Sequence, residues 1–265
     1  MKIALKLAYL GDRYYGFQHQ PNLITIDYEL RRALSKIGVT NGDFCYAGRT
    51  DKGVSALGQV IDFWIEEDKA HLARPRCVNG RLPRDIWAWA YAVAPIGFSA
   101  RWNALWREYR YILWHDGLDL DRMREATDFF KGEHDFRNFS SCKNDAIRTI
   151  LKLELSENNG LITFDIRADG FLWNMARRIV SALELIGAGT KEIDWIHDLL
   201  NLRLEEGAPT APAEGLIFMD VGYREIKWEN DEYSRKRASR ILESIAKRRI
   251  SSACVAKSLH LGMKF

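Results

Sequence analysis

The sequence predicts an α+β fold in which two similar halves form a continuous, mainly antiparallel sheet flanked by helices, with a cleft at the centre. Three observations support this fold class. Short segments near both ends of the chain alternate apolar and polar residues with the period of two that is typical of strands. A strand, a helix and further strands are predicted twice, once before and once after Pro95. The chain also contains no short repeat and no low-complexity segment.

The first half begins with an expected strand from Lys2 to Leu10. Thr25 is typical of a helix N-cap, and the apolar residues that follow it at helical spacing predict a helix over residues 26–37. Residues 60–64 and 87–93 alternate again and predict two more strands. The second of these strands is expected to carry its large aromatic rings on one face.

The second half repeats this order after Pro95. Its last predicted strand runs through Leu216, Phe218 and Asp220. The other elements expected in this half are a strand over 108–114, a helix over 119–131, a loop over 132–136, a hairpin formed by 150–155 and 161–168, a helix starting near Phe171, and a helix over 192–202.

We therefore expect three regions: an N-terminal half (1–98), a C-terminal half (99–223) and a basic tail (224–265) that is expected to be helical. The tail carries 11 Lys and Arg against 5 Asp and Glu, a charge of +6, although the whole chain carries only +3. Two interpretations of this tail stay open. It lies against phosphate groups, or it forms a solvated surface helix that only aids solubility.

The composition argues against several classes of protein. The chain has 265 residues, of which 47% are hydrophobic and 28% charged, as in ordinary globular proteins. No apolar run approaches the roughly 20 residues of a membrane-spanning helix, and the N-terminus alternates like a strand rather than a signal peptide. A reducing cytoplasm is the expected location, with neither a zinc site nor a disulfide framework. The cysteines are far apart and form no CxxC pair: Cys45, Cys77, Cys142 and Cys254.

One segment, residues 47–60, combines charged residues and glycines in a way that a hydrophobic core does not need. Asp51 lies two residues after Arg49, between Gly48 and Gly53. Because glycine adopts backbone angles that other residues avoid, Asp51 can lie on a sharp turn, with the Arg49 guanidinium close enough to keep its carboxylate ionised. Such a carboxylate can act as a nucleophile. An Asp that only caps a helix or a turn has the same local sequence, so this segment alone does not decide.

Short motifs spread over residues 3–223 occur in the order found in one enzyme family. The most specific is Ala47-Gly48-Arg49-Thr50-Asp51-Lys52-Gly53-Val54-Ser55-Ala56-Leu57-Gly58-Gln59-Val60. Others are Tyr15-Gly16-Phe17-Gln18, Arg107-Glu108-Tyr109-Arg110-Tyr111, Gly132-Glu133-His134-Asp135-Phe136, Met175 with Arg177, and Ala211-Pro212-Ala213-Glu214-Gly215-Leu216. In these motifs the chain resembles the TruA type of tRNA pseudouridine synthase.

The resemblance implies an isomerase that converts uridine to pseudouridine in tRNA. Asp51 would be the catalytic nucleophile, and Tyr109 would line the uracil pocket. Arg177 would be the basic residue that pairs with the aspartate. Leu216 would lie beneath the base, and Arg49 would hold the flipped nucleotide. Arg49 and Arg177 are both expected to keep Asp51 charged in a water-excluded pocket.

The resemblance also implies where the enzyme acts and with what partners. The modified uridines would lie on the 3′ side of the anticodon stem-loop, at tRNA positions 38, 39 and 40. The enzyme would work as a homodimer, without a cofactor and without a membrane, and each half would contain ferredoxin-like elements. Lys52 and Ser55 follow the archaeal and eukaryotic version of the motif. Residues 99–103 depart from the usual pattern, and the tail matches none of the family's motifs.

Two other functions fit parts of the sequence. A non-catalytic tRNA-binding module or tRNA folding chaperone needs only the basic turns and exposed rings, but it gives no reason for Arg49, Asp51 and Tyr109 to occur together. A hydrolase with a covalent aspartyl intermediate normally needs a second carboxylate as acid or base. None lies beside Asp51 in this motif.

Overall fold

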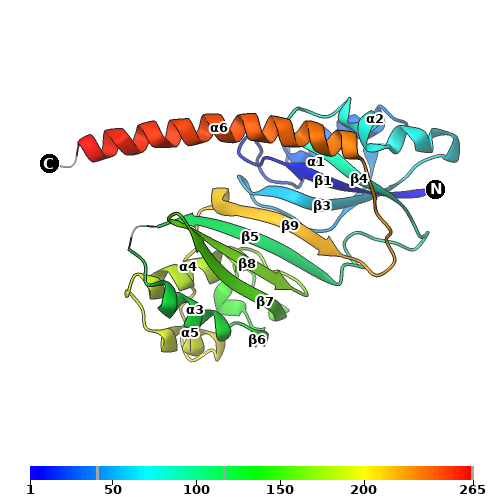
Figure 1. Ribbon diagram of the computed structural model, residues 1–265. Coiled ribbons are helices and arrows are strands. Elements are labelled where there is room, and N and C mark those ends of the chain that lie inside the picture. The colour runs from blue at the N-terminus through cyan, green and yellow to red at the C-terminus, as the bar shows by residue number, and fades with distance from the viewer. Residues whose placement is uncertain (40–41, 116, 264–265) are drawn as a thin grey trace.

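The computed structural model describes residues 1–39, 42–115 and 117–263. Within these residues a single sheet of ten strands runs through the molecule, and helices flank it (Figure 1). The strands are β1 (Lys2–Tyr9), β2 (Cys45–Tyr46), β3 (Ser55–Trp64), β4 (Ile86–Ala94), β5 (Trp106–Trp114), β6 (Gly132–Asp135), β7 (Ile147–Asn158), β8 (Leu161–Ala168), β9 (Leu216–Gly222) and β10 (Glu229–Asn230). The α-helices are α1 (Ile26–Ser35), α2 (Pro75–Asn79), α3 (Leu120–Asp128), α4 (Met175–Gly187), α5 (Ile193–Leu200) and α6 (Glu232–Gly262). The predicted α+β class, with a mainly antiparallel sheet flanked by helices, is confirmed.

The two parts of the sheet meet at a short parallel junction. Across the sheet the strand order is β10-β4-β1-β3-β9-β5-β8-β7-β6, and β2 pairs with β3. Among the described strands every pair is antiparallel except β3 with β9. In that pair Ser55 lies opposite Ile217, and Ala56 lies opposite Phe218. Since β3 comes early in the chain and β9 late, this junction joins distant segments at the middle of the sheet.

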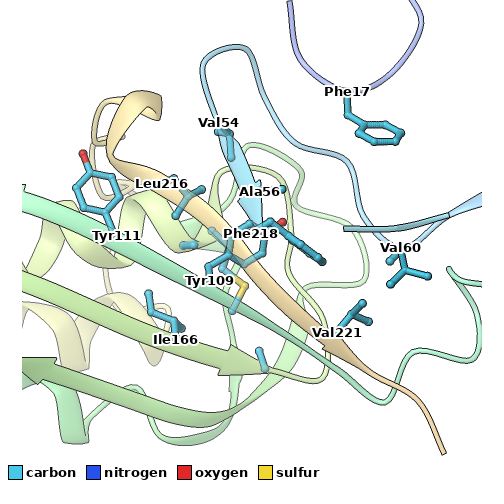
Figure 2. Packing of buried hydrophobic residues seen from close by; sticks show 14 of the residues in the cluster. Phe17, Val54, Ala56, Val60, Tyr109, Tyr111, Ile166, Leu216, Phe218 and Val221 are labelled. Atoms are coloured by element: carbon cyan, nitrogen blue, oxygen red, sulfur yellow. The ribbon is translucent and has the colours of Figure 1, made fainter. Parts of the chain in front are cut away.

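The main hydrophobic core extends through both parts of the sheet. Leu5 and Leu7 of β1 are buried in one cluster with Leu30 of α1, and that cluster continues through β5, β9 and α4. Figure 2 shows the packing near the junction, where the rings of Tyr109 and Phe218 lie together. Burying one large apolar side chain contributes about 1.5–3 kcal/mol, so this shared core holds the junction in one arrangement.

Two local predictions are wrong. Helix α4 begins at Met175 rather than near Phe171, because Asn174 has a left-handed backbone with φ of 66° and no helix continues through it. Residues 132–136, expected as a loop, contain β6, which pairs antiparallel with β7 at the edge of the sheet. Its glycine and charged residues have little intrinsic preference for a strand, so the pairing comes from the neighbouring edge.

Helix α6 lies on the face of the sheet opposite the main core. Its first turns pack through Ala238 against Ala8 of β1 and Trp87 of β4. Successive side chains of a strand point to opposite faces, so Ala8 and Leu7 face different sides. Farther along, Arg249 pairs with Asp12 at 2.9 Å. The described side chains of the second half of α6 are exposed, and its end reaches past the rest of the molecule (Figure 1).

Candidate active site

The five residues singled out in the sequence all line one cleft of about 1090 Å³. Asp51 and Arg49 lie in the loop between β2 and β3. Tyr109 lies on β5, Arg177 on α4, and Leu216 at the start of β9. The cleft therefore lies where the parallel junction brings the two parts of the chain together, and both parts contribute to it.

Buried polar groups fix the loop that carries Asp51. The amide of Gln59 donates to the carbonyl oxygen of Gly48 at 2.7 Å and accepts from its backbone N–H at 3.3 Å. The hydroxyls of Tyr9 and Thr50 share a hydrogen bond of 2.8 Å. Burial raises the pKa of Tyr9 to about 12, so this phenol stays protonated at neutral pH. The loop is thus held on both sides of Arg49, just before Asp51.

Close approach of a second loop requires glycine at two positions. A Cβ atom on Gly11 would lie 2.0 Å from the carbonyl oxygen of Val54, too close for any side chain. Gly16 has a φ of +84°, and a Cβ there would lie 2.9 Å from the carbonyl oxygen of Thr50. These glycines let the loop after β1 pack directly on the backbone around Asp51.

Both oxygens of the Asp51 carboxylate have partners. Oδ2 accepts from Nη1 of Arg177 at 3.0 Å, and Oδ1 accepts from the indole N–H of Trp173 at 3.2 Å. Arg177 is itself fixed, since Nε donates to the carbonyl oxygen of Ala211 at 2.7 Å and Nη1 to Oδ1 of Asn174 at 3.0 Å. The Asp51 side chain is 34% exposed and that of Arg177 only 17%. The carboxylate is therefore held in a cation pair yet open to the cleft.

Arg49 does not form the second cation pair that the sequence spacing suggested. Its side chain is exposed, and Nε donates to the hydroxyl of Tyr46 at 3.4 Å. Among the described residues the ion-pair partner of Asp51 is Arg177. The expectation that Asp51 lies between two guanidinium groups is therefore wrong for this arrangement, because the loop turns Arg49 toward β2. Arg49 still lines the cleft.

Tyr109 and Leu216 form the apolar part of the cleft. The ring of Tyr109 meets Phe171 and Phe218 edge-on, with centroids 4.8 and 5.0 Å away. Burial raises the pKa of Tyr109, Tyr9 and Asp51 raise it further by smaller amounts, and Arg107 lowers it slightly. The phenol is therefore neutral and can donate or accept one hydrogen bond. Leu216 is almost fully buried beside it.

Comparisons with known proteins identify the family of this chain. Residues 126–224 match the family described as tRNA pseudouridine synthase. Over 259 residues the chain is 61% identical to tRNA pseudouridine synthase A of Methanothrix thermoacetophila, covering 98% of this chain and 97% of that protein. The protein of the same name from Methanosarcina barkeri is 43% identical over 246 residues, covering 90% of this chain and 91% of that protein.

The chain belongs to the tRNA pseudouridine synthase A family. The enzyme class expected from the sequence, an isomerase, is confirmed by this membership. Among solved structures, a Cbf5-Nop10-Gar1 complex aligns with 82% of this chain and 49% of that chain, at 16% identity and a TM-score of 0.35.

The cleft of this tRNA pseudouridine synthase contains residues that the sequence analysis missed. Trp173 contacts Asp51, Asn174 contacts Arg177, and Gln59 contacts Gly48 in the loop that carries Asp51. The available signal was position: Trp173 and Asn174 directly precede the Met175 and Arg177 motif. Gln59 lies inside the matched segment 47–60, but nothing in the sequence indicates its contact with Gly48.

Arg107 connects the two walls of the cleft. It donates to the carbonyl oxygens of Ala47 at 3.1 Å and Asp169 at 3.2 Å, which come from opposite sides of the junction. A third bond goes to the carbonyl oxygen of Arg101 at 2.7 Å. Arg107 therefore has a structural role, whereas the exposed cations and rings of the rim are free to meet a ligand. They include Tyr15, Lys52, Arg101 and Trp102.

In residues 1–39, 42–115 and 117–263, no group of three or more His, Cys, Asp or Glu side chains could hold a metal ion. No helix within the same residues is both long and apolar enough to cross a membrane.

Proposed function

We propose that this protein converts uridine to pseudouridine in tRNA, on the 3′ side of the anticodon stem-loop at positions 38, 39 and 40, with Asp51 as the nucleophile. The observation that carries the proposal is the pair between Asp51 and Arg177, 3.0 Å apart although 126 positions separate them in the chain. A carboxylate that lines a cleft, with its cation supplied by a separate element, is suited to covalent catalysis.

Two routes fit this carboxylate. In the first, Asp51 donates an electron pair to C1′ while the bond from C1′ to N1 breaks, and uracil leaves as an anion with the electrons of that bond. Uracil then turns, C5 attacks C1′, and the electrons of the ester bond return to Asp51. Loss of the C5 proton and gain of a proton at N1 complete pseudouridine. In the second route Asp51 adds first to C6 of the base.

The other cleft residues have roles that follow from their chemistry. Arg177 neutralises the carboxylate, because it is partly buried and bound to it directly. Tyr109 stacks on the uracil ring and transfers the C5 proton, and Leu216 lies beneath the base and supplies an apolar surface for it. Arg49, exposed at the rim, binds a phosphate of the flipped nucleotide.

The substrate must open to reach this site. A uridine inside a stem is accessible only after its nucleotide leaves the stack, which costs a few kcal/mol. Rings such as Trp102 and Tyr15 at the rim can stack on exposed bases, and the cations beside them can bind phosphates. Because A-form RNA is recognised mainly through its shape and phosphates, we expect binding that is sensitive to salt and tolerant of base changes.

Tritium release from tRNA labelled at uracil C5 tests the proposal, because C5 loses its hydrogen when it bonds to ribose. We expect the parent to release label, and Asp51→Asn to bind tRNA equally but to release about 10⁴-fold less. Release by the variant at the parent rate would contradict the role of Asp51. Binding without release by the parent itself would favour the alternative, a non-catalytic tRNA-binding module or folding chaperone. Mapping pseudouridine in the product tests the position.

We further propose a cytoplasmic homodimer whose chain divides into an N-terminal half (1–98), a C-terminal half (99–223) and a basic tail (224–265). The cysteine pattern and the resemblance to the family support this proposal. Light scattering of the purified protein with and without tRNA measures the oligomeric state. A monomer under both conditions would contradict the dimer.

A further inference from the structure

Trp173 contacts Asp51, the nucleophile that we propose, and its side chain is exposed. In the described part of the chain, the other partner of the carboxylate is Arg177, which is mostly buried. The indole N–H of Trp173 donates to Oδ1 of Asp51 at 3.2 Å, while Arg177 holds Oδ2. Trp173 is 62% exposed at the wall of the cleft. In this state each carboxylate oxygen has one hydrogen-bond partner, and the indole covers one side of Oδ1.

The two partners of the carboxylate differ in how firmly they are held. Arg177 makes two further hydrogen bonds and is mostly buried. The indole of Trp173 makes the one bond to Asp51, and its ring lies largely in solvent. When a nucleoside enters, the indole is therefore the partner that can leave at lower cost.

We propose that Oδ1 is the oxygen that bonds to the nucleoside, and that Trp173 is a positioning residue that covers Oδ1 until the nucleoside displaces its indole. This inference rests on the proposed function. A lone pair of Oδ1 forms the new bond to carbon, so Oδ1 becomes an ester oxygen and loses its charge and most of its strength as an acceptor. Oδ2 becomes the carbonyl oxygen and keeps its bond to Arg177.

The backbone of Trp173 stays fixed while its side chain moves. Its carbonyl oxygen accepts from the N–H of Ser141 at 3.0 Å and from the hydroxyl of Ser140 at 3.2 Å. Asn174, the next residue, donates from Nδ2 to the hydroxyl of Ser141 at 2.9 Å. Rotation about the side-chain bonds therefore moves the ring along the cleft wall, where it can stack on the extruded base.

Trp173→Phe tests this inference, because it keeps an aromatic ring and removes the N–H donor. Trp64→Phe is the matched control, since Trp64 is 51% exposed, lies outside the cleft and does not contact Asp51 in the described structure. At saturating tRNA we expect single-turnover tritium release by Trp173→Phe to be about tenfold faster than that of the parent, because a hydrogen bond to a charged acceptor no longer has to break. The control should stay within about twofold of the parent. An unchanged or slower rate for Trp173→Phe would overturn the inference.

Fluorescence gives a second readout that does not depend on turnover. The emission of Trp173 is obtained by subtracting the fluorescence spectrum of Trp173→Phe from that of the parent. We expect tRNA to shift this emission in the same direction as Asp51→Ala does without tRNA, since both remove the indole from the carboxylate. No shift with bound tRNA would also overturn the inference. Absence of tritium release from the parent would instead contradict the proposed function, so the two failures are distinguishable.

Discussion

Helix α6 and the loop that carries Asp51 present charged side chains in two different ways. The loop is anchored by buried groups on several sides, including Gln59, Tyr9 and the backbone N–H of Phe17, which donates to the carbonyl oxygen of Thr50 at 3.0 Å. Helix α6 packs through its first turns and extends with its remaining side chains exposed. A reacting carboxylate needs one defined position, whereas cations that meet a flexible polyanion need only exposure.

The comparison also explains why the cleft lies at the parallel junction. Residues of the loop come from one part of the chain, and Arg177, Tyr109 and Trp173 come from the other. The β3–β9 pairing, the shared core and Arg107 help to fix the distance between them. Changes in the cleft should therefore affect catalysis strongly, and changes in α6 should affect only binding.

Arg177→Met should have the largest effect. It removes the cation from Asp51 and leaves the carbonyl oxygen of Ala211 without its guanidinium donor. We expect tritium release to fall by about 10²–10³-fold, as for other groups that stabilise charge in an active site. Arg49→Met, the matched loss of a cleft arginine that does not contact Asp51, should raise KM more than it lowers kcat. Equal effects of the two variants on kcat would contradict the assignment.

Much of the fold could be predicted from the sequence because its periodicity reports burial. Residues 161–168 were expected to form a strand, and β8 spans Leu161–Ala168. The helix expected over 192–202 is α5, Ile193–Leu200. The start of α4 could not be predicted, since the left-handed backbone of Asn174 depends on contacts with Ser141 and Arg177 that sequence spacing does not reveal.

The candidate site was predictable only in part, and for a related reason. Arg177, Tyr109 and Leu216 were assigned through the resemblance, whereas the local pattern offered Asp51 and Arg49 as candidates but did not decide their roles. Arg49 lies two positions before Asp51, and this spacing suggested that the two side chains pair. A turn can direct such side chains apart, and here Arg49 contacts Tyr46 while Asp51 pairs with Arg177. Trp173 lies 122 positions from Asp51, so only the fold could reveal their hydrogen bond.

The stability of the anchored loop should depend on pH through Tyr9. Burial raises its pKa from 10.0 to about 12, so between these values the unfolded chain loses a proton that the folded protein keeps. The contribution of Tyr9 is therefore fully present below pH 10 and is lost as pH rises toward 12, by about 1.4 kcal/mol per pH unit. Urea unfolding of the parent and Tyr9→Phe between pH 9 and 11.5 measures this slope. Parallel curves for the two proteins would contradict it.

Gln59→Leu should destabilise the same loop at neutral pH. The substitution leaves the N–H and carbonyl groups of Gly48 without partners inside the protein. We expect the free energy of unfolding to fall by about 2 kcal/mol, and tritium release to fall because Asp51 loses its defined position. Gln18→Leu, at an exposed position, is the control and should leave stability within about 0.5 kcal/mol of the parent. If the control loses as much stability as Gln59→Leu, the hydrogen bonds between Gln59 and Gly48 are unimportant.

Helix α6 carries a row of cations on the side that faces away from the sheet. Lys236, Arg240 and Lys247 recur at spacings of four and seven residues and therefore share one side of the helix. Ala238 and Ile245, which fall on the opposite side, face the sheet or lie partly buried. Lys247 pairs with Glu243 at 2.8 Å, and in the described structure Lys236 and Arg240 have no acidic partner.

Replacing this row with glutamine separates the two interpretations of the tail and should give the smallest effect. If the row binds phosphates, the slope of log Kd for tRNA against log salt concentration should decrease by about 2 to 3, while kcat at saturating tRNA stays unchanged. A charge-matched control replaces three exposed lysines elsewhere: Lys36, Lys131 and Lys227. If only the loss of net charge matters, the salt dependence of Kd should change equally in the α6 variant and in the lysine control. That result would favour a helix that aids only solubility. A fall in kcat would contradict the separation of the anchored cleft from the exposed helix.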